Sequence, residues 1–285
     1  MRCTLHRGLL GAALLGLIAL AAVAATALRY NLEPEAEWKY KTTTQAEGVL
    51  TLAGPLGAQP IPVSIKSVDT RSLKVIDAAE EDGWFNLETR QIDGTYEGTI
   101  SGQPLGAGAQ SLPPINYKLK MNELGDVKDL EMLPAEGEAA ANNIDLQLNQ
   151  LAALAQLTGF PEEDLEAGDS WTKEIELQGA EGEKLVATIE NKLIGLSDTQ
   201  ATIESTYDMP LPPTDGVLRM GMDLPIRIEG KAAGTNLMVW NTTEQCLETV
   251  SSDSTIDIKL YITGMLAEPA VGKFAVTSSG ERITE

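Results

Sequence analysis

Histidine, the side chain most often used as a general base and as a metal ligand, occurs once in this chain, at His6. The chain beyond this residue therefore has no means of building a Ser-His-Asp triad, a Cys-His pair or a histidine zinc site. Carboxylate pairs, as in glycoside hydrolases, are the remaining catalytic option. Because 42 acidic residues bring some pair together in any fold, and aromatic residues that stack on sugars are only 5%, we expect no enzyme, no cofactor and no metal.

Short motifs add little catalytic potential. Gly272 and Lys273 lack the upstream glycine and the Ser or Thr of a phosphate-binding loop, and Gly106 and Gly108 lack the third glycine of a dinucleotide site. Cys246 is the only cysteine beyond the N-terminal segment, so it is expected to act as a buried small hydrophobe.

The N-terminus has the pattern of an export signal. Arg2 and Arg7 precede an uncharged apolar run over residues 8–28, and the small-residue triplets AVA and ATA near its end offer cleavage sites. The run also approaches the ~20 residues that span a bilayer. Residues 1–28 are therefore either a signal peptide or an uncleaved membrane anchor. Both alternatives predict an exported protein, which is periplasmic, on the cell surface or extracellular.

The charge balance limits the classes of partner that the protein can bind. Asp and Glu total 42 against 21 Lys and Arg, which gives a formal net charge of −21. A surface this acidic repels nucleic acid and anionic lipid headgroups. We expect no nucleic-acid partner, and we keep an apolar small molecule or lipid as a possible ligand and the N-terminal segment as a possible membrane contact. Protein partners are not indicated by the sequence.

The dominant hydrophobic period is two, which is typical of half-buried antiparallel strands. INYKLKMN at residues 115–122 and IDIKLYIT at residues 256–263 show it most clearly. Turn signals separate such runs: NELGDV at 122–127, IDGTY at 92–96 and AAGTNL at 232–237. The spacing predicts a meander of antiparallel strands.

One segment has a helical period instead. Residues 138–157 are rich in Ala, Leu, Gln and Asn, and Gly159 and Pro161 follow as end signals. The apolar stripe of this predicted helix consists of Ile144, Leu148, Leu151 and Ala155.

Two stretches of similar sequence flank the predicted helix. LEPEAEW and LEAGDSW each place a tryptophan, Trp38 and Trp171, at the start of a strand-like run. This echo predicts two β units, and the alternative is that tryptophans and acidic turns commonly precede strands.

The domain organisation follows from this echo. It comprises a first β unit over residues 30–134, a helical connector over 135–159 and a second β unit over 160–285. The fold class is α+β, dominated by antiparallel curved sheets that resemble half-barrels.

The GDSW motif that follows Pro161, together with the hairpin sequence MNELGDVKDLEM, resembles a family of exported bacterial β-rich proteins. More distantly, the pattern is similar to the half-barrel lipid carriers of bacterial envelopes, of the LolA/LolB and LppX/LprG type. That resemblance implies a strongly curved antiparallel sheet that wraps helices and leaves an apolar cavity for acyl chains. The chain departs from it in two respects: Cys3 lies on the wrong side of the apolar run for a lipoprotein anchor, and only one helix is predicted.

Two functions remain open from the sequence. The first is an exported non-catalytic envelope protein that binds an apolar or amphiphilic ligand. The second is a structural or protein-interaction module of the cell envelope without a ligand. A ligand-binding protein needs a cavity of several hundred Å3, roughly 300 Å3 or more. The residues expected to form the pocket wall or the core are Ile144, Leu148, Leu151, Trp38 and Trp171.

Overall fold

The computed structural model describes residues 25–54, 57–112, 114, 116–133, 159–178, 184–219, 223–264 and 266–284. The predicted helix at 138–157 lies outside these ranges, together with Ile144, Leu148, Leu151 and Ala155. Most of the predicted signal or anchor segment also lies outside them. Within the described ranges, no helix is long and apolar enough to cross a membrane.

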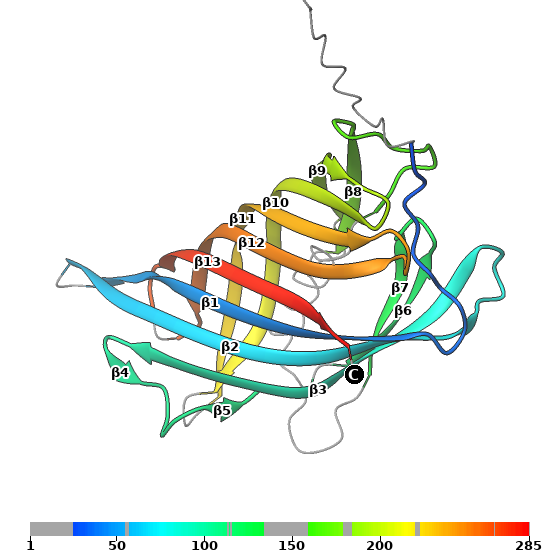
Figure 1. Ribbon diagram of the computed structural model, residues 1–285. Helices are drawn as coiled ribbons and strands as arrows, with labels where there is room; N and C mark the ends of the chain where they lie inside the picture. Colours follow the sequence, from blue (N-terminus) through cyan, green and yellow to red (C-terminus); the bar gives the residue numbers. More distant parts are fainter. Residues whose placement is uncertain are drawn as a thin grey trace, which may run out of the picture.

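The described residues form one antiparallel sheet of 13 strands (Figure 1). The strands are β1 (Glu37–Gly54), β2 (Gly57–Ala78), β3 (Trp84–Ile100), β4 (Gln103–Pro104), β5 (Gln110–Ser111), β6 (Asn116–Asn122), β7 (Val127–Leu133), β8 (Ser170–Gln178), β9 (Lys184–Leu196), β10 (Gln200–Arg219), β11 (Asp223–Asn241), β12 (Cys246–Ile262) and β13 (Ala270–Ile283). The predicted β-dominated, antiparallel architecture is therefore confirmed.

The sheet consists of two meanders placed side by side. Strands β7, β6, β3, β2 and β1 follow one another in the first, and β13 back to β8 follow one another in the second. The two join through β1 and β13, which pair from Lys39 with Ile283 to Thr51 with Val271. The joint is a full-length strand pair, so the predicted division into two separate sheets is not confirmed.

Alternation of side chains gives the sheet a more buried inner face and a more exposed outer face. On β6, the side chains of Tyr117, Leu119 and Met121 are buried at 5%, 3% and 0% exposure. On β12, Ile256 and Ile258 pack on buried core residues, as predicted from the period of two. The outer neighbours on the same strands, such as Asp253, remain exposed.

The curved sheet closes at one end, called here the closed end. Lys173 on β8 forms an ion pair with Asp126 in the β6–β7 turn, so the two outermost hairpins of the sheet meet there. Figure 1 shows β6, β7 and β8 gathered on one side of the molecule. The Phe160 amide also donates to the Leu124 carbonyl at 2.7 Å, which ties the start of the second meander to the turn of the first.

Two segments outside the sheet complete the closed end. Thr26 and Leu165 exchange backbone hydrogen bonds of 3.0 Å, and the Tyr30 amide donates to the Glu123 carbonyl at 2.9 Å. The main core cluster, called here the closed-end core, includes five buried residues from these segments: Leu28, Tyr30, Leu32, Phe160 and Leu165. This core therefore contains residues from both of the predicted β units.

Two of the predicted turns are wrong. IDGTY lies inside β3, where a register shift opposite Thr70 and Arg71 marks a β-bulge instead of a chain reversal. AAGTNL lies inside β11, where an added Cβ on Gly234 would stand 2.6 Å from the Asp253 carbonyl oxygen. Gly234 therefore allows the paired strand to approach closely. A glycine required for close packing cannot be distinguished in the sequence from a glycine required for a turn. The NELGDV turn is confirmed, with Gly125 at φ 80°.

The Lys173–Asp126 pair predicts a pH-dependent stability. Burial by itself raises the pKa of Asp126, but hydrogen bonds from Lys173 and Asn122 and the Lys173 charge outweigh it, so the pKa is lowered. A folded-state pKa below the unfolded value stabilises the fold at neutral pH, and this stabilisation is lost as pH falls through the lowered pKa. Because Asp126 is 46% exposed, we expect Asp126→Asn to cost about 1 kcal/mol at neutral pH.

Urea unfolding of wild type and Asp126→Asn between about pH 7 and about pH 3 measures this effect. The difference in unfolding free energy should shrink toward the acid end. Asp129→Asn, which removes the more exposed partner of Lys120 on the same hairpin, should show the same trend at a smaller amplitude, because Lys120 also lowers the pKa of Asp129. A difference between wild type and Asp126→Asn that is constant with pH would contradict the assignment.

Candidate binding cavity on the inner face

A cavity of about 210 Å3 lies on the inner face next to the closed-end core. Strands β1, β2, β3, β6, β12 and β13 contribute its walls, and Tyr30 of the N-terminal segment contributes part of its lining. Polar residues of its lining include Tyr40, Thr42, Thr44, Ser67, Asp69, Arg71 and Tyr117. They alternate with outward residues along their strands, so the pleat brings them together from distant parts of the sequence.

An ion pair stands in this cavity. The Arg71 Nε–H donates to Asp69 Oδ2, and the two side chains are only 20% and 16% exposed. Burial raises the pKa of Asp69, the Arg71 charge and hydrogen bond act against it, and the nearby Asp93 charge adds to the rise. Asp69 Oδ1 is buried and has no hydrogen-bond donor among the residues that the structure describes. One acceptor of the pair is therefore unsatisfied by the described part of the chain.

Two phenols in the cavity wall remain uncharged. Burial raises the pKa of Tyr117, although Arg71 and a hydrogen bond with Thr89 act to lower it. Burial also raises the pKa of Tyr40 well above its ordinary value, helped by Cys246 and Tyr30. Both hydroxyls are protonated at physiological pH, so each can donate and accept a hydrogen bond.

A line of polar side chains, called here the polar row, crosses the inner face from β9 to β2. Adjacent members are register partners on neighbouring strands. The row consists of Asn191, Ser205, Asn236, Ser252, Ser278, Thr44 and Ser67. Ser205 Oγ donates to Asn191 Oδ1 at 2.6 Å, and Thr44 Oγ1 donates to Ser278 Oγ at 3.2 Å.

The polar row separates two apolar layers. On β10, Ile203 belongs to the closed-end core and Met209 to a second cluster, and the buried Ser205 lies between them on the same face. Beyond the row, toward the β1–β2 and β12–β13 turns, lies a band called here the apolar collar. In this band Ala46 pairs with Ile65 and Val276, and Phe274 pairs with Ile256. Met209 pairs with Ala232, which in turn pairs with Ile256. The members of the collar are Ala46, Ile65, Val276, Phe274, Ile256 and Met209. Ile65 is 36% exposed although it lies on the inner face.

The two tryptophans predicted from the sequence open their strands as expected. Trp38 lies at the start of β1 and Trp171 at the start of β8. Both are partly buried and pack on the same core cluster, and Trp171 Nε1 donates to the Gly159 carbonyl at 2.6 Å. They support the core next to the cavity and do not line it. Ile144, Leu148 and Leu151 lie outside the described residues.

Sequence reasoning missed the polar row and the Asp69–Arg71 pair. A usable signal exists for the row, because Ser205 interrupts an otherwise apolar alternation from Ile203 to Tyr207. The pairing of Thr44 with Ser278 carries no such signal, because it depends on which strands become neighbours.

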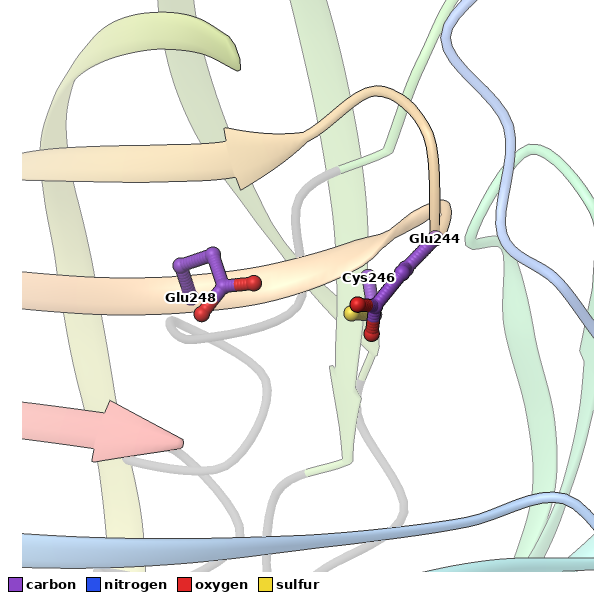
Figure 2. A group of neighbouring side chains, drawn as sticks. All are labelled: Glu244, Cys246 and Glu248. Atoms are coloured by element: carbon purple, nitrogen blue, oxygen red, sulfur yellow. The ribbon is translucent and has the colours of Figure 1, made fainter. Parts of the chain in front are cut away.

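A second cluster of potential ligand atoms lies at the start of β12. Figure 2 shows Glu244, Cys246 and Glu248, whose ligand atoms lie within 4.8 Å of one another. Arg282 occupies the position that a cation would take: its Nη1 donates to Glu244 Oε2 and, at 2.9 Å, to Cys246 Sγ, and its Nη2 lies 3.0 Å from Glu248 Oε1. The guanidinium therefore already balances these carboxylates.

The Cys246 thiol is expected to be unreactive in the folded protein. Burial raises its pKa to about 11, and only the Arg282 charge and hydrogen bond act against this. Alkylation by iodoacetamide near pH 8 should be more than about 100-fold slower at Cys246 in the native protein than in urea, because only the thiolate reacts. Peptide mapping keeps Cys246 separate from Cys3. Equal rates in both conditions would show that the thiol is accessible and ionised.

Comparisons with known proteins do not assign a family. No family model matches the chain, and no curated protein matches it. Among solved structures, one of lipid–protein interactions in lipovitellin has a TM-score of 0.43 at 9% identity, covering 89% of this chain. The chain spans only 26% of that lipovitellin chain. The binding domain of botulinum neurotoxin serotype C1 has a TM-score of 0.15 at 8% identity, covering 85% of this chain and 78% of that one. The predicted resemblance to envelope lipid carriers stays a prediction.

Proposed function

We propose that the protein is an exported, non-catalytic binding protein that holds an apolar or amphiphilic ligand on the inner face of its curved sheet. One observation carries the proposal: the inner face is apolar again beyond the polar row, on the side away from the closed-end core. Ile65, at 36% exposure, remains partly accessible there, and Leu105, at 40% exposure, lies next to Gly98, the register partner of Ile65. Exposed apolar side chains on a concave surface are typical of ligand sites.

The cavity contributes the polar end of such a site. Its volume of about 210 Å3 is below the ~300–1,000 Å3 of drug-sized pockets, so the ligand has to extend along the collar as well. The absence of a catalytic role is part of the proposal, and it is supported by the lack of histidine beyond His6. Export is supported by the basic and apolar pattern of residues 1–28, either as a cleaved signal or as an anchor.

A pair of matched variants tests the binding face. Ile65 and Val49 are both partly exposed, at 36% and 41%, but Ile65 lies on the inner face and Val49 on the outer face. We expect Ile65→Glu to weaken binding of a fluorescent fatty-acid or monoacylglycerol probe at least tenfold, roughly 1.4 kcal/mol, because the charge must lose its hydration when the probe binds. Val49→Glu should leave the affinity unchanged.

The wild type is the decisive measurement. Native mass spectrometry of the purified chain and probe titration at micromolar concentration should detect a bound or bindable amphiphile. If the wild type carries no lipid and binds no probe, the binding function is refuted, and the structural or protein-interaction module of the envelope becomes the better assignment.

A further inference from the structure

Along the inner face, the side chains are polar next to the closed-end core and apolar farther away, toward the β1–β2 and β12–β13 turns, called here the open end. On β1 this order reads Thr42 and Thr44, which line the cavity, and then Ala46, Leu50 and Leu52 toward the β1–β2 turn. The stretch from Ala46 to Leu52 is roughly 20 Å long at about 3.3 Å per residue. It exceeds the ~15 Å half-thickness of a bilayer's hydrocarbon core, so it is long enough for an acyl chain.

Two buried polar atoms in the polar zone lack a partner among the residues that the structure describes. They are Asp69 Oδ1, an acceptor in the cavity, and Asn191 Nδ2, a donor in the polar row. A buried polar atom without a hydrogen bond is destabilising by about 1–3 kcal/mol. Each such atom needs a partner that the described residues do not supply, and a bound ligand or a bound water can provide it.

The charges of the cavity discriminate between head groups. Asp69 already neutralises Arg71, and its Oδ1, to which no described residue donates, can accept hydrogen bonds, so it favours a head group that donates. A carboxylate or phosphate head would face Asp69 Oδ1 and a chain of net charge −21. An ammonium head would lose its hydration beside the Arg71 guanidinium. Uncharged hydroxyls match Asp69 as well as the hydroxyls of Tyr40 and Tyr117.

We propose that the inner face binds an uncharged amphiphile with a hydroxyl-bearing head, with the head toward the Asp69–Arg71 pair and the tail along the apolar collar toward the open end. The inference rests on the proposed function and adds to it the class of head group and the direction of the ligand.

The direction is measurable by tryptophan quenching. Trp38, Trp171 and Trp240 belong to or pack on the closed-end core, and Trp84 pairs with Asn122 at the same end. Monoacylglycerols brominated near the head should therefore quench tryptophan fluorescence more strongly than those brominated near the tail end. The opposite gradient would overturn the proposed direction.

The head preference is measurable by titration with monomeric amphiphiles that share one tail. We expect the monoacylglycerol to bind at least about tenfold more tightly than the fatty acid or the alkylammonium. Asp69→Asn leaves the Arg71 charge unpaired, so the ratio of affinities should move at least about tenfold toward the fatty acid. Asp253→Asn, the same charge change on the outer face, should leave the ratio unchanged. Thermal unfolding checks that both variants are folded.

The outcomes separate the two claims. If no amphiphile binds the wild type, the proposed function fails and this inference fails with it. If amphiphiles bind but the fatty acid or the alkylammonium is preferred, or if Asp69→Asn leaves the ratio unchanged, only the head-group assignment is overturned and the binding function stands.

Discussion

Trp240→Ala is expected to lower the free energy of unfolding by about 3–5 kcal/mol. Trp240 is 1% exposed, and its ring packs edge-on against Tyr30 at 4.6 Å and against Phe160 at 4.9 Å between ring centroids. Truncation removes the shared partner of both rings and leaves a cavity in the closed-end core. Tyr30 and Phe160 come from the two different predicted β units, so the loss should appear in one unfolding transition.

Two further variants make this prediction specific. Trp240 Nε1 is buried and has no acceptor among the described residues, so Trp240→Phe should cost much less than the alanine variant, because it keeps an aromatic ring and removes the unsatisfied donor. Trp84 is partly exposed, and the Lys128 Nζ lies 3.8 Å from the centroid of its ring. Trp84→Ala should lower the free energy of unfolding by about 1 kcal/mol or less. Chemical denaturation followed by circular dichroism measures all three. Two transitions, of which Trp240→Ala shifts only one, would show two independent units.

Leu193→Asp is expected to destabilise the fold by more than about 4 kcal/mol or to prevent folding. Leu193 on β9 is 0% exposed and belongs to the closed-end core, and a carboxylate placed there has no partner to offset its lost hydration. The adjacent Ile194 points to the outer face and is 46% exposed. Ile194→Asp should therefore change the unfolding free energy by no more than about 0.5 kcal/mol.

This pair of neighbours tests the register of β9. A shift by one residue would exchange the two faces, because side chains alternate along a strand. Comparable losses in the two variants, or a larger loss for Ile194→Asp, would contradict the pairing of Leu193 with Ile203. Soluble yield gives a first measurement, and urea unfolding gives the magnitude if both variants fold.

The sequence by itself determined the local properties of the strands. The period of two in residues 116–122 and 256–262 depends only on the alternation of the extended backbone, so the buried face of β6 and β12 was readable without a structure. The NELGDV turn was also readable from the local sequence. Gly125, at φ 80°, adopts a conformation that other residues rarely adopt.

The tertiary structure decided whatever depends on which strands become neighbours. Gly94 and Gly234 carry turn-like signals but lie inside strands, and at Gly234 the reason is the close approach of the paired Asp253–Ser254 backbone. The joining of the two meanders through β1 and β13, the sharing of one core by Tyr30 and Phe160, and the alignment of the polar row all follow from pairing across large sequence separations. The local sequence does not specify these pairings, because the alternation within a strand defines its buried face but not the strand with which it pairs.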